Sequence, residues 1–136
     1  METITATVEY AGDLRTNATH LKSQNSITTD APTDNQGKGE AFSPTDLVSA
    51  ALSSCMMTIM GQVALREGVD MKGLKADVVK IMAVNPRKIA EIKITFSHSD
   101  LKATDIQKQK LMSAARTCPV ALSLSENLQQ TIVFNW

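Results

Sequence analysis

Residues 43–67, SPTDLVSAALSSCMMTIMGQVALRE, decide the fold of this 136-residue chain. The segment begins with Ser43, which can cap a helix, and with Pro44, which is tolerated in the first turn. Asp46 suits the positive end of a helix dipole. Gly68, directly after the segment, can adopt the left-handed conformation that ends a helix. The pattern predicts one long helix from Pro44 to Glu67.

The apolar residues of this helix surround its whole circumference. A helix that is hydrophobic on all sides must be covered on all sides, and a chain of this length offers little material for that. We therefore expect a second copy of the chain to supply the missing cover, as a homodimer. The stretch 47–65 carries no charge and approaches the length of a membrane span, but its serines, Thr58 and Gln62 favour a helix buried in protein.

Strand-like runs flank the helix on both sides. Before it, we expect strands over 3–9, 14–20 and 26–30, a turn at 11–13 and a loop over 31–39. After it, we expect strands over 75–84 and 89–97 joined by a turn at 85–88, a helix over 104–116, a short helix over 119–125 and a strand over 129–136. Strands grouped in hairpins predict an α+β fold with antiparallel sheets, as a single domain over 1–136.

The composition excludes several classes of function. Fourteen basic and fourteen acidic residues leave no excess charge for nucleic acid or an anionic membrane. Met1 and Glu2 begin no basic segment that leads into an apolar stretch, so we expect no secretory signal and a cytoplasmic protein. In a reducing cytoplasm two cysteines favour a catalytic or redox-sensing pair over a structural disulfide. Neither their spacing nor that of the histidines predicts a metal site.

The two cysteines occupy different settings. Cys55 lies inside an apolar helix, where a cysteine is usually a small buried hydrophobe. Cys118 precedes Pro119, and the residue before proline avoids the α region as an N-cap does, so we expect Cys118 to start the short helix. The N–H groups there would stabilise a thiolate. A Cys55 thiolate would need a cation from elsewhere, which these patterns do not identify.

Several blocks of sequence together carry a resemblance to a known family. They are residues 43–55, the run Thr117-Cys118-Pro119-Val120, and the shorter blocks Asp30-Ala31-Pro32 and Gly39-Glu40. On these residues the chain resembles the OsmC/Ohr family of osmotically inducible and organic hydroperoxide resistance proteins, in its OsmC-like branch. The resemblance runs over essentially the full length, and the spacing of the two cysteines fits it.

The resemblance implies an intertwined, strand-swapped dimer with a buried central helix and two active sites at the subunit interface. It implies that Cys55 is the reactive cysteine, that Cys118 resolves its oxidised form, and that Arg15 pairs with the thiolate. The implied reaction reduces hydroperoxides through a Cys55 sulfenic acid and a Cys55–Cys118 disulfide. An external dithiol, commonly of lipoyl type, would then reduce the disulfide. No cofactor or metal is implied.

One position departs from the family pattern. Peroxide-reducing members carry glutamate after the proline of the helix start, whereas this chain has Thr45 there and Asp46 one residue later. A one-residue step turns a side chain by about 100° around a helix, so Asp46 need not reach the arginine as that glutamate would. Capping the helix is an equally good role for Asp46. Phe42, Met56 and Met57 could line an apolar pocket that favours organic peroxides over hydrogen peroxide.

Two other functions stay open at this point. The chain could be a redox sensor that oxidises without useful turnover, or a protein that binds a small ligand and whose cysteines are incidental. The separation of the two sulfur atoms discriminates between them, because a disulfide needs the two cysteines close together.

Overall fold

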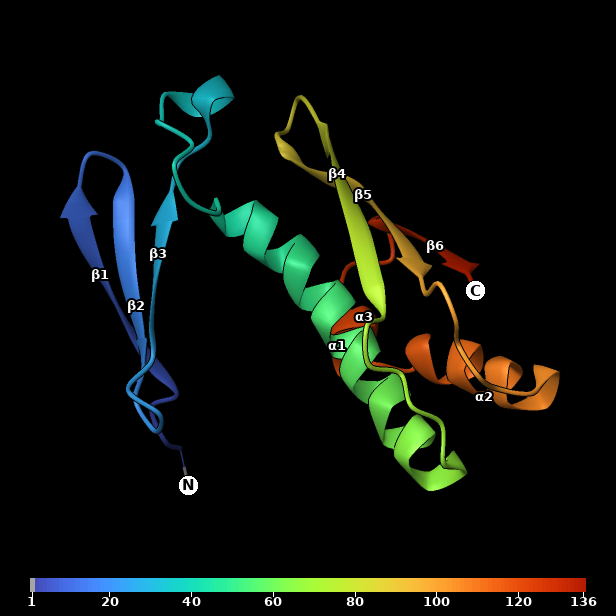
Figure 1. The fold of residues 1–136 in the computed structure, drawn as a ribbon. Coiled ribbons are helices and arrows are strands. Elements are labelled where there is room, and N and C mark those ends of the chain that lie inside the picture. The colour runs from blue at the N-terminus through green and yellow to red at the C-terminus, as the bar shows by residue number, and fades with distance from the viewer. Residues whose placement is uncertain (1) are drawn as a thin grey trace. The chain divides into compact units, whose positions relative to one another are not determined.

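The computed structural model describes residues 2–136, which form two compact units divided between Leu47 and Val48. Figure 1 shows the elements along the chain. They are β1 (Ala6–Gly12), β2 (Arg15–His20), β3 (Ser26–Asp30), the 3-10 turn η1 (Thr33–Asn35), α1 (Pro44–Glu67), β4 (Lys75–Ala83), β5 (Lys88–Ser97), α2 (Asp105–Ala115), α3 (Pro119–Ser123) and β6 (Gln129–Asn135). The expected α+β class is confirmed, and the prediction of one domain over 1–136 stays a prediction.

The first unit is built on an antiparallel meander with the strand order β1-β2-β3. The turn between β1 and β2 is tight, because Gly12, Asp13 and Leu14 all have positive φ angles. In the register of β2 and β3, Arg15 lies directly opposite Asp30. This pairing places a cation and an anion at the same end of the sheet.

The loop after β3 folds back on itself through backbone hydrogen bonds. The N–H groups of Asn35 and Gly37 both donate to the carbonyl of Pro32, at 2.9 and 3.0 Å, and the N–H of Gly39 donates to that of Ala31 at 3.1 Å. Gly37 sits so close to Ala31 that a Cβ atom built on it would lie 1.7 Å from the Ala31 carbonyl oxygen. The loop therefore requires glycine at position 37, and its hydrogen bonds fix the position of Glu40.

Helix α1 begins and ends at the residues that the sequence predicts. Ser43 Oγ accepts the N–H of Asp46 at 3.1 Å, and Asp46 Oδ2 accepts the N–H of Ser43 at 3.0 Å, which forms a reciprocal cap. At the other end Gly68 has a φ of 69°, and the N–H of Val69 donates to the carbonyl of Ala64 at 2.9 Å. Each end of the helix thus has a partner for at least one of its free backbone groups.

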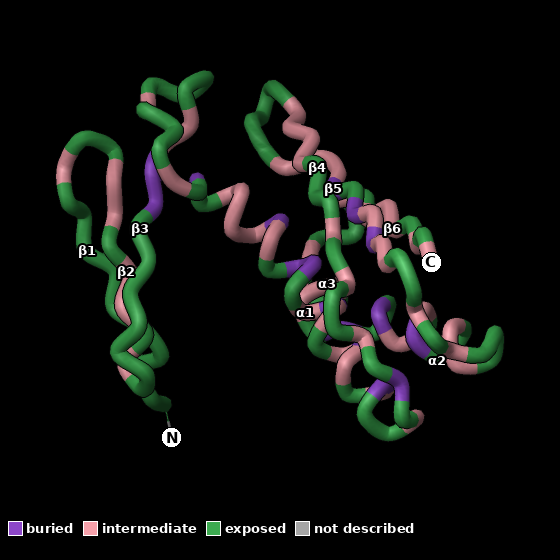
Figure 2. Tube along the Cα trace, viewed as in Figure 1, coloured by how far each residue is buried: buried purple, intermediate pink, exposed green. Residues whose placement is uncertain are grey.

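The second unit packs α1 and α2 against a three-stranded sheet with the order β4-β5-β6. Ile92, Ile94 and Phe96 of β5 are fully buried, and the alternating residue Lys93 is exposed. The strand therefore turns one face to the helices, as its period-two pattern predicts. Figure 2 shows the buried residues of this unit recurring along α1, β5 and α2. Together they form one core, whose members are Leu52, Met56, Met60, Ala64, Val69, Ile92, Ile94, Phe96, Leu111, Ala115 and Cys118.

One strand pairing differs from the expectation of antiparallel sheets. β4 and β5 are antiparallel, but β5 and β6 run parallel, with Phe96 opposite Phe134. The connection between them contains α2 and α3, and two parallel neighbours need such a crossover because a tight turn cannot join them. Helices α2 and α3 are therefore part of the link that makes this pair parallel.

Helix α1 buries only part of its apolar surface within one copy of the chain. Its buried residues are Ser49, Leu52, Ser53, Met56, Met60 and Ala64, whereas Leu65 is 84% exposed and Met57 and Ile59 are partly exposed. Among residues 2–136, this one helix is long and apolar enough to cross a membrane by length and composition, a property that core helices of soluble proteins share.

Candidate functional site

The fold of the second unit brings the two cysteines together. Cys55 lies in the middle of α1 and is partly exposed, while Cys118 is fully buried at the start of α3. Both are free thiols, and Cys55 lies near enough to Cys118 to contribute to the raised pKa of that thiol. Residues far apart in the sequence thus become neighbours in one core, and a redox pair requires two cysteines that are close together.

Cys118 occupies the helix-capping position that its proline neighbour predicts. Its backbone is extended, with φ −66° and ψ 142°, and Pro119 is the first helical residue. The Cys118 sulfur accepts a hydrogen bond from the backbone N–H of Ala121 at 3.3 Å. The cap holds the sulfur at the start of α3, where Cys55 of α1 is near enough to affect its pKa.

Burial is the largest influence on the pKa of Cys118, and it raises that pKa above its ordinary value. The hydrogen bond from Ala121 opposes the increase, and the neighbouring Cys55 side chain adds to it. Cys118 therefore keeps its proton near neutral pH and can donate its S–H toward Cys55. In such a pair the protonated, buried thiol is suited to resolve an oxidised partner, not to attack a substrate first.

Arg15, at the start of β2, is held by two carboxylates in the first unit. Its Nη2 lies 2.7 Å from Glu40 Oε2 and 3.4 Å from Asp30 Oδ2. The side chain of Asp30 is fully buried, that of Arg15 is 32% exposed and that of Glu40 is 62% exposed. The hydrogen bond to Glu40, followed by that to Asp30, raises the pKa of Arg15 above its already high value, so the group stays a cation.

The loop after β3 also holds the Asp30 carboxylate, at the same oxygen that Arg15 contacts. Asp30 Oδ2 accepts the backbone N–H of Glu40 at 2.9 Å. This hydrogen bond is the main reason that the pKa of Asp30 lies below its usual value, with Arg15 as a further cause, although burial acts in the opposite direction. Asp30 is therefore an anion at neutral pH. We call Arg15, Asp30 and Glu40 the arginine cluster.

The family model and the solved structures point to one family. Residues 37–133 match the family model of the OsmC-like proteins. The chain belongs to the OsmC-like family. A candidate osmotic stress induced and detoxification response protein from Psychrobacter arcticus has a structure similar to that of this chain, with 44% identity, 99% of this chain and 98% of the other covered, and a TM-score of 0.94.

More distant OsmC-like structures share the fold. An OsmC-like protein from Mycoplasma pneumoniae has a TM-score of 0.80 at 16% identity, with 98% of this chain and 96% of the other covered. The organic hydroperoxide resistance protein OsmC from Legionella pneumophila has a TM-score of 0.75 at 14% identity, with both chains fully covered. None of the curated proteins matches this OsmC-like chain in sequence.

The remaining predicted site residues of this OsmC-like chain have clear places in the structure. Asp46 caps α1 through Ser43, and Ser43 Oγ also lies 3.2 Å from Thr45 Oγ1. Met56 is 1% exposed and belongs to the core, so within one chain it presents no surface to a pocket. Met57 is partly buried, and Phe42, in the first unit, is 55% exposed. A pocket lined by Phe42 and Met57 stays a prediction.

Asp30 and Glu40 are the partners of Arg15 that the sequence analysis did not assign. Both lie in the short blocks that carried the resemblance, but no role followed from them there. The strand register contained the signal, since an arginine directly opposite an aspartate on the neighbouring strand is a cross-strand ion pair. Glu40 could not be found this way, because the folded loop after β3 brings it back to Arg15.

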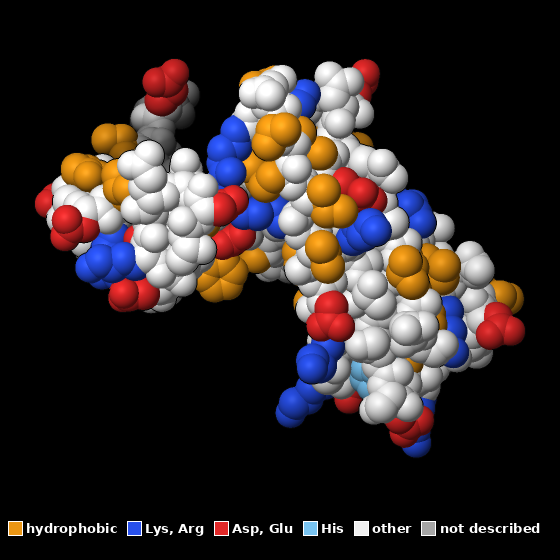
Figure 3. All heavy atoms as spheres, turned by 90° about the horizontal axis from the view of Figure 1, so that it is seen from above, with side chains coloured by type: hydrophobic (Ala, Val, Ile, Leu, Met, Phe, Trp, Pro, Cys, Tyr) orange, Lys and Arg blue, Asp and Glu red, His pale blue; other side chains and the backbone are white. Residues whose placement is uncertain are grey.

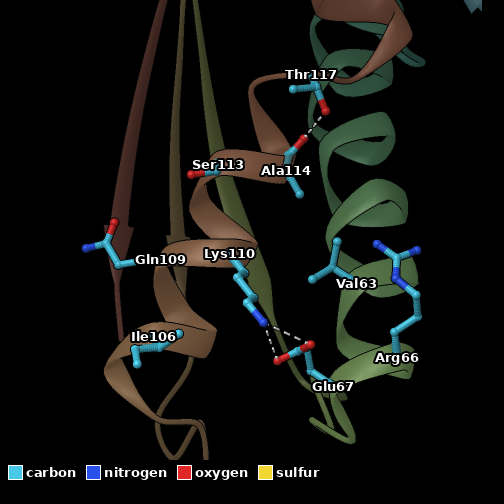
Figure 4. Close-up of a pocket in the computed structure, with 9 residues that line it drawn as sticks. All are labelled: Val63, Arg66, Glu67, Ile106, Gln109, Lys110, Ser113, Ala114 and Thr117. Carbon is cyan, nitrogen blue, oxygen red and sulfur yellow. Dashed lines mark hydrogen bonds and ion pairs between the residues drawn. The ribbon is translucent and has the colours of Figure 1, made fainter.

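A separate groove of about 670 Å³ runs between α1 and α2 in the second unit, and neither cysteine lines it. Figure 4 shows Lys110 of α2 reaching across it to Glu67 of α1, at 3.2 Å from both carboxylate oxygens. The same view shows Thr117, next to Cys118 in the chain, with its hydroxyl donating to the carbonyl of Ala114 at 2.8 Å. The described residues contain no cluster of side chains that could hold a metal ion.

Proposed function

We propose that this OsmC-like protein is a thiol-dependent hydroperoxide reductase, with Cys55 as nucleophile and Cys118 as its resolving partner. The observation that carries the proposal is the pair of neighbouring free thiols, with Cys55 packed against the core that contains the buried Cys118. The name of the Legionella relative, an organic hydroperoxide resistance protein, supports hydroperoxides as the substrate class. We place the reaction in the cytoplasm, where thiols are kept reduced.

The reaction proceeds in three steps. The Cys55 thiolate attacks the terminal oxygen of the hydroperoxide, the O–O bond breaks, and the leaving alkoxide takes a proton to become an alcohol. Cys55 is now a sulfenic acid, which condenses with the Cys118 thiol to form a disulfide and release water. An external dithiol, of lipoyl type or similar, then reduces the disulfide by thiol exchange and leaves as its own disulfide. No metal or bound cofactor takes part.

The buried position of Cys118 suits the second step. A thiol that keeps its proton does not compete with Cys55 for the peroxide, and Cys118 is a neighbour of the sulfur that would be oxidised. Arg15 is the cation that we assign to stabilise the Cys55 thiolate and orient the peroxide, because a nearby guanidinium favours the ionised form of a thiol.

We further propose that the working unit is a homodimer. The apolar residues that α1 leaves exposed within one copy of the chain need cover, and a second α1 would supply it. Figure 3 shows hydrophobic side chains scattered among charged ones on the viewed surface, and Val8, Ile27, Val79 and Leu65 are among the exposed apolar residues. A dimer would allow a site to draw residues from both copies.

One observation favours a redox sensor as the second candidate. Arg15 faces two carboxylates, so its positive charge is more than balanced within the arginine cluster. A cation compensated in this way stabilises a thiolate less, and slow oxidation without efficient turnover would then suffice for a signalling role. Steady-state turnover separates the two functions.

The test is peroxidase turnover with cumene hydroperoxide as substrate and dihydrolipoamide as reductant. We expect the wild type to turn over, Cys55→Ser to be inactive, and Ser99→Ala, at an exposed position after β5, to retain full activity. Oxidation of Cys55 without sustained turnover would favour the sensor. No reaction of Cys55 with any hydroperoxide would overturn both.

A further inference from the structure

The two carboxylates that hold Arg15 are not equivalent. Asp30 is fully buried, and its Oδ2 has two contacts, with Arg15 Nη2 and with the backbone N–H of Glu40. The Glu40 side chain is 62% exposed, and its side-chain contact with Arg15 is the single 2.7 Å pair. Water and salt screen an exposed ion pair, whereas a buried carboxylate has no such competition. Asp30 is therefore the fixed partner and Glu40 the replaceable one.

The Arg15 guanidinium is held through one of its three nitrogen atoms, Nη2. Both carboxylates contact Nη2, while the buried Nε has no hydrogen-bond partner. A guanidinium has five N–H donors in a rigid plane, so fixing one nitrogen sets the direction of the others. Asp30, whose own place is fixed by β3 and by the loop amide of Glu40, thereby determines where the free donors of Arg15 point.

We propose that Asp30 is a positioning residue for Arg15 and that Glu40 is the partner that gives way when an anionic or peroxide oxygen binds to Arg15. This inference rests on the proposed function, in which Arg15 acts on Cys55 and its substrate. In this role Asp30 acts through Arg15 and not on the substrate or a reacting sulfur atom. Its contribution is to hold the guanidinium in one orientation while the exposed carboxylate leaves.

The experiment compares Arg15→Ala, Asp30→Asn and the double variant. The rate of Cys55 oxidation by cumene hydroperoxide is measured by stopped flow, and the pH profile of Cys55 alkylation by iodoacetamide is measured alongside. We expect each single variant to react about tenfold more slowly than the wild type, a coupling of the size seen for residues in direct contact. The double variant should be no slower than Arg15→Ala, because Asp30 acts through Arg15. The midpoint of the alkylation profile should move to higher pH in Asp30→Asn.

Two further variants complete the design. Asp13→Asn removes an exposed aspartate at a turn position with φ 54°, where asparagine is well tolerated, and should react at the wild-type rate. Glu40→Gln, at an exposed position, removes the charge that competes for Arg15 and should react at least as fast as the wild type at low salt. This variant tests the inference even if Asp30→Asn does not fold.

The outcomes separate the inference from the proposed function. If Arg15→Ala reacts at the wild-type rate, the role of Arg15 in the proposed function fails. If Arg15→Ala is slow but a folded Asp30→Asn reacts like Asp13→Asn, the positioning role is overturned and the function stands. An equal loss from Asp30→Asn in both backgrounds would show a merely structural role and would also overturn it. A Glu40→Gln variant that reacts more slowly than the wild type would contradict the claim that Glu40 is the replaceable partner of Arg15.

Discussion

Replacing Cys118 with serine should separate the structural role of this residue from its redox role. In the wild type the sulfur caps α3 by accepting the N–H of Ala121 at 3.3 Å, and the side chain is fully buried. A serine hydroxyl has nearly the same size and is among the best helix-capping groups, so it can keep this hydrogen bond. It cannot form a disulfide with Cys55.

The size of the effect on stability follows from these contacts. Cys118→Ser should unfold within about 1 kcal/mol of the wild type, because the cap is retained. Cys118→Ala loses the cap, worth about 0.5–2 kcal/mol, and the burial of a group the size of one methylene, worth about 0.8 kcal/mol. For a chain of this size, each kcal/mol lowers the melting temperature by about 2–4 °C, which thermal unfolding followed by circular dichroism resolves.

The redox result should be the same for both variants. With Cys118 absent, a Cys55 sulfenic acid has no partner, and excess hydroperoxide oxidises it further to the sulfinic acid. Mass spectrometry of the treated protein should show the gain of two oxygen atoms on Cys55, and turnover with dihydrolipoamide should fall sharply. Sustained wild-type turnover by a folded Cys118→Ser variant would refute the assignment of Cys118 as the resolving thiol.

Four further predictions concern stability. Leu111→Ala, which empties a fully buried core position on α2, should lower the free energy of unfolding by about 2.7–5.0 kcal/mol in urea denaturation, and a loss below about 1 kcal/mol would contradict the assigned core. Thr104→Ala removes the side chain that accepts the N–H of Gln107 in the capping box of α2. It should lower the free energy of unfolding by about 0.5–2 kcal/mol in the same assay, with the exposed Ser99→Ala as control. Burial raises the pKa of Cys118, so the protonated Cys118 contributes its full stabilising effect below the thiol's unfolded pKa of about 8.5. That effect is lost as pH rises through the folded pKa. The melting temperature of the wild type should therefore fall more than that of Cys118→Ser between neutral and alkaline pH. The pKa of Asp30 is lowered in the folded protein, so the stabilising effect of the ionised Asp30 is present above the unfolded pKa of about 3.9 and is lost as pH falls through the folded pKa. The difference in stability between the wild type and Asp30→Asn should therefore shrink below about pH 4. A constant difference would argue against the Arg15 and Glu40 contacts.

Local chemistry made the elements of this fold predictable. Ser43 and Pro44 begin α1, and Gly68 ends it, because each residue suits the backbone conformation at its position. Cys118 before Pro119 likewise fixes the start of α3. The parallel pairing of β6 with β5 was not predictable in this way. Both directions leave the same alternation of apolar residues, and only the path of the crossover decides between them.

The candidate site was predictable in part. The sequence pointed to Cys55, Cys118 and Arg15 through family resemblance, and Cys118 also through its cap. The closeness of the two thiols depends on how α3 packs on α1, which no local pattern encodes. The two carboxylates on Arg15 depend on strand register and on a folded loop, so they too appear only in three dimensions.

The most direct test of the account is the fate of both thiols after the reduced protein meets one equivalent of cumene hydroperoxide. Thiol titration followed by peptide mapping under non-reducing conditions would measure it. We predict that two thiols per chain disappear together, that a Cys55–Cys118 disulfide forms within one chain, and that dihydrolipoamide restores both thiols. Persistence of both thiols, or oxidation of Cys55 with Cys118 still free, would contradict the central claim that these two sulfur atoms act as a pair.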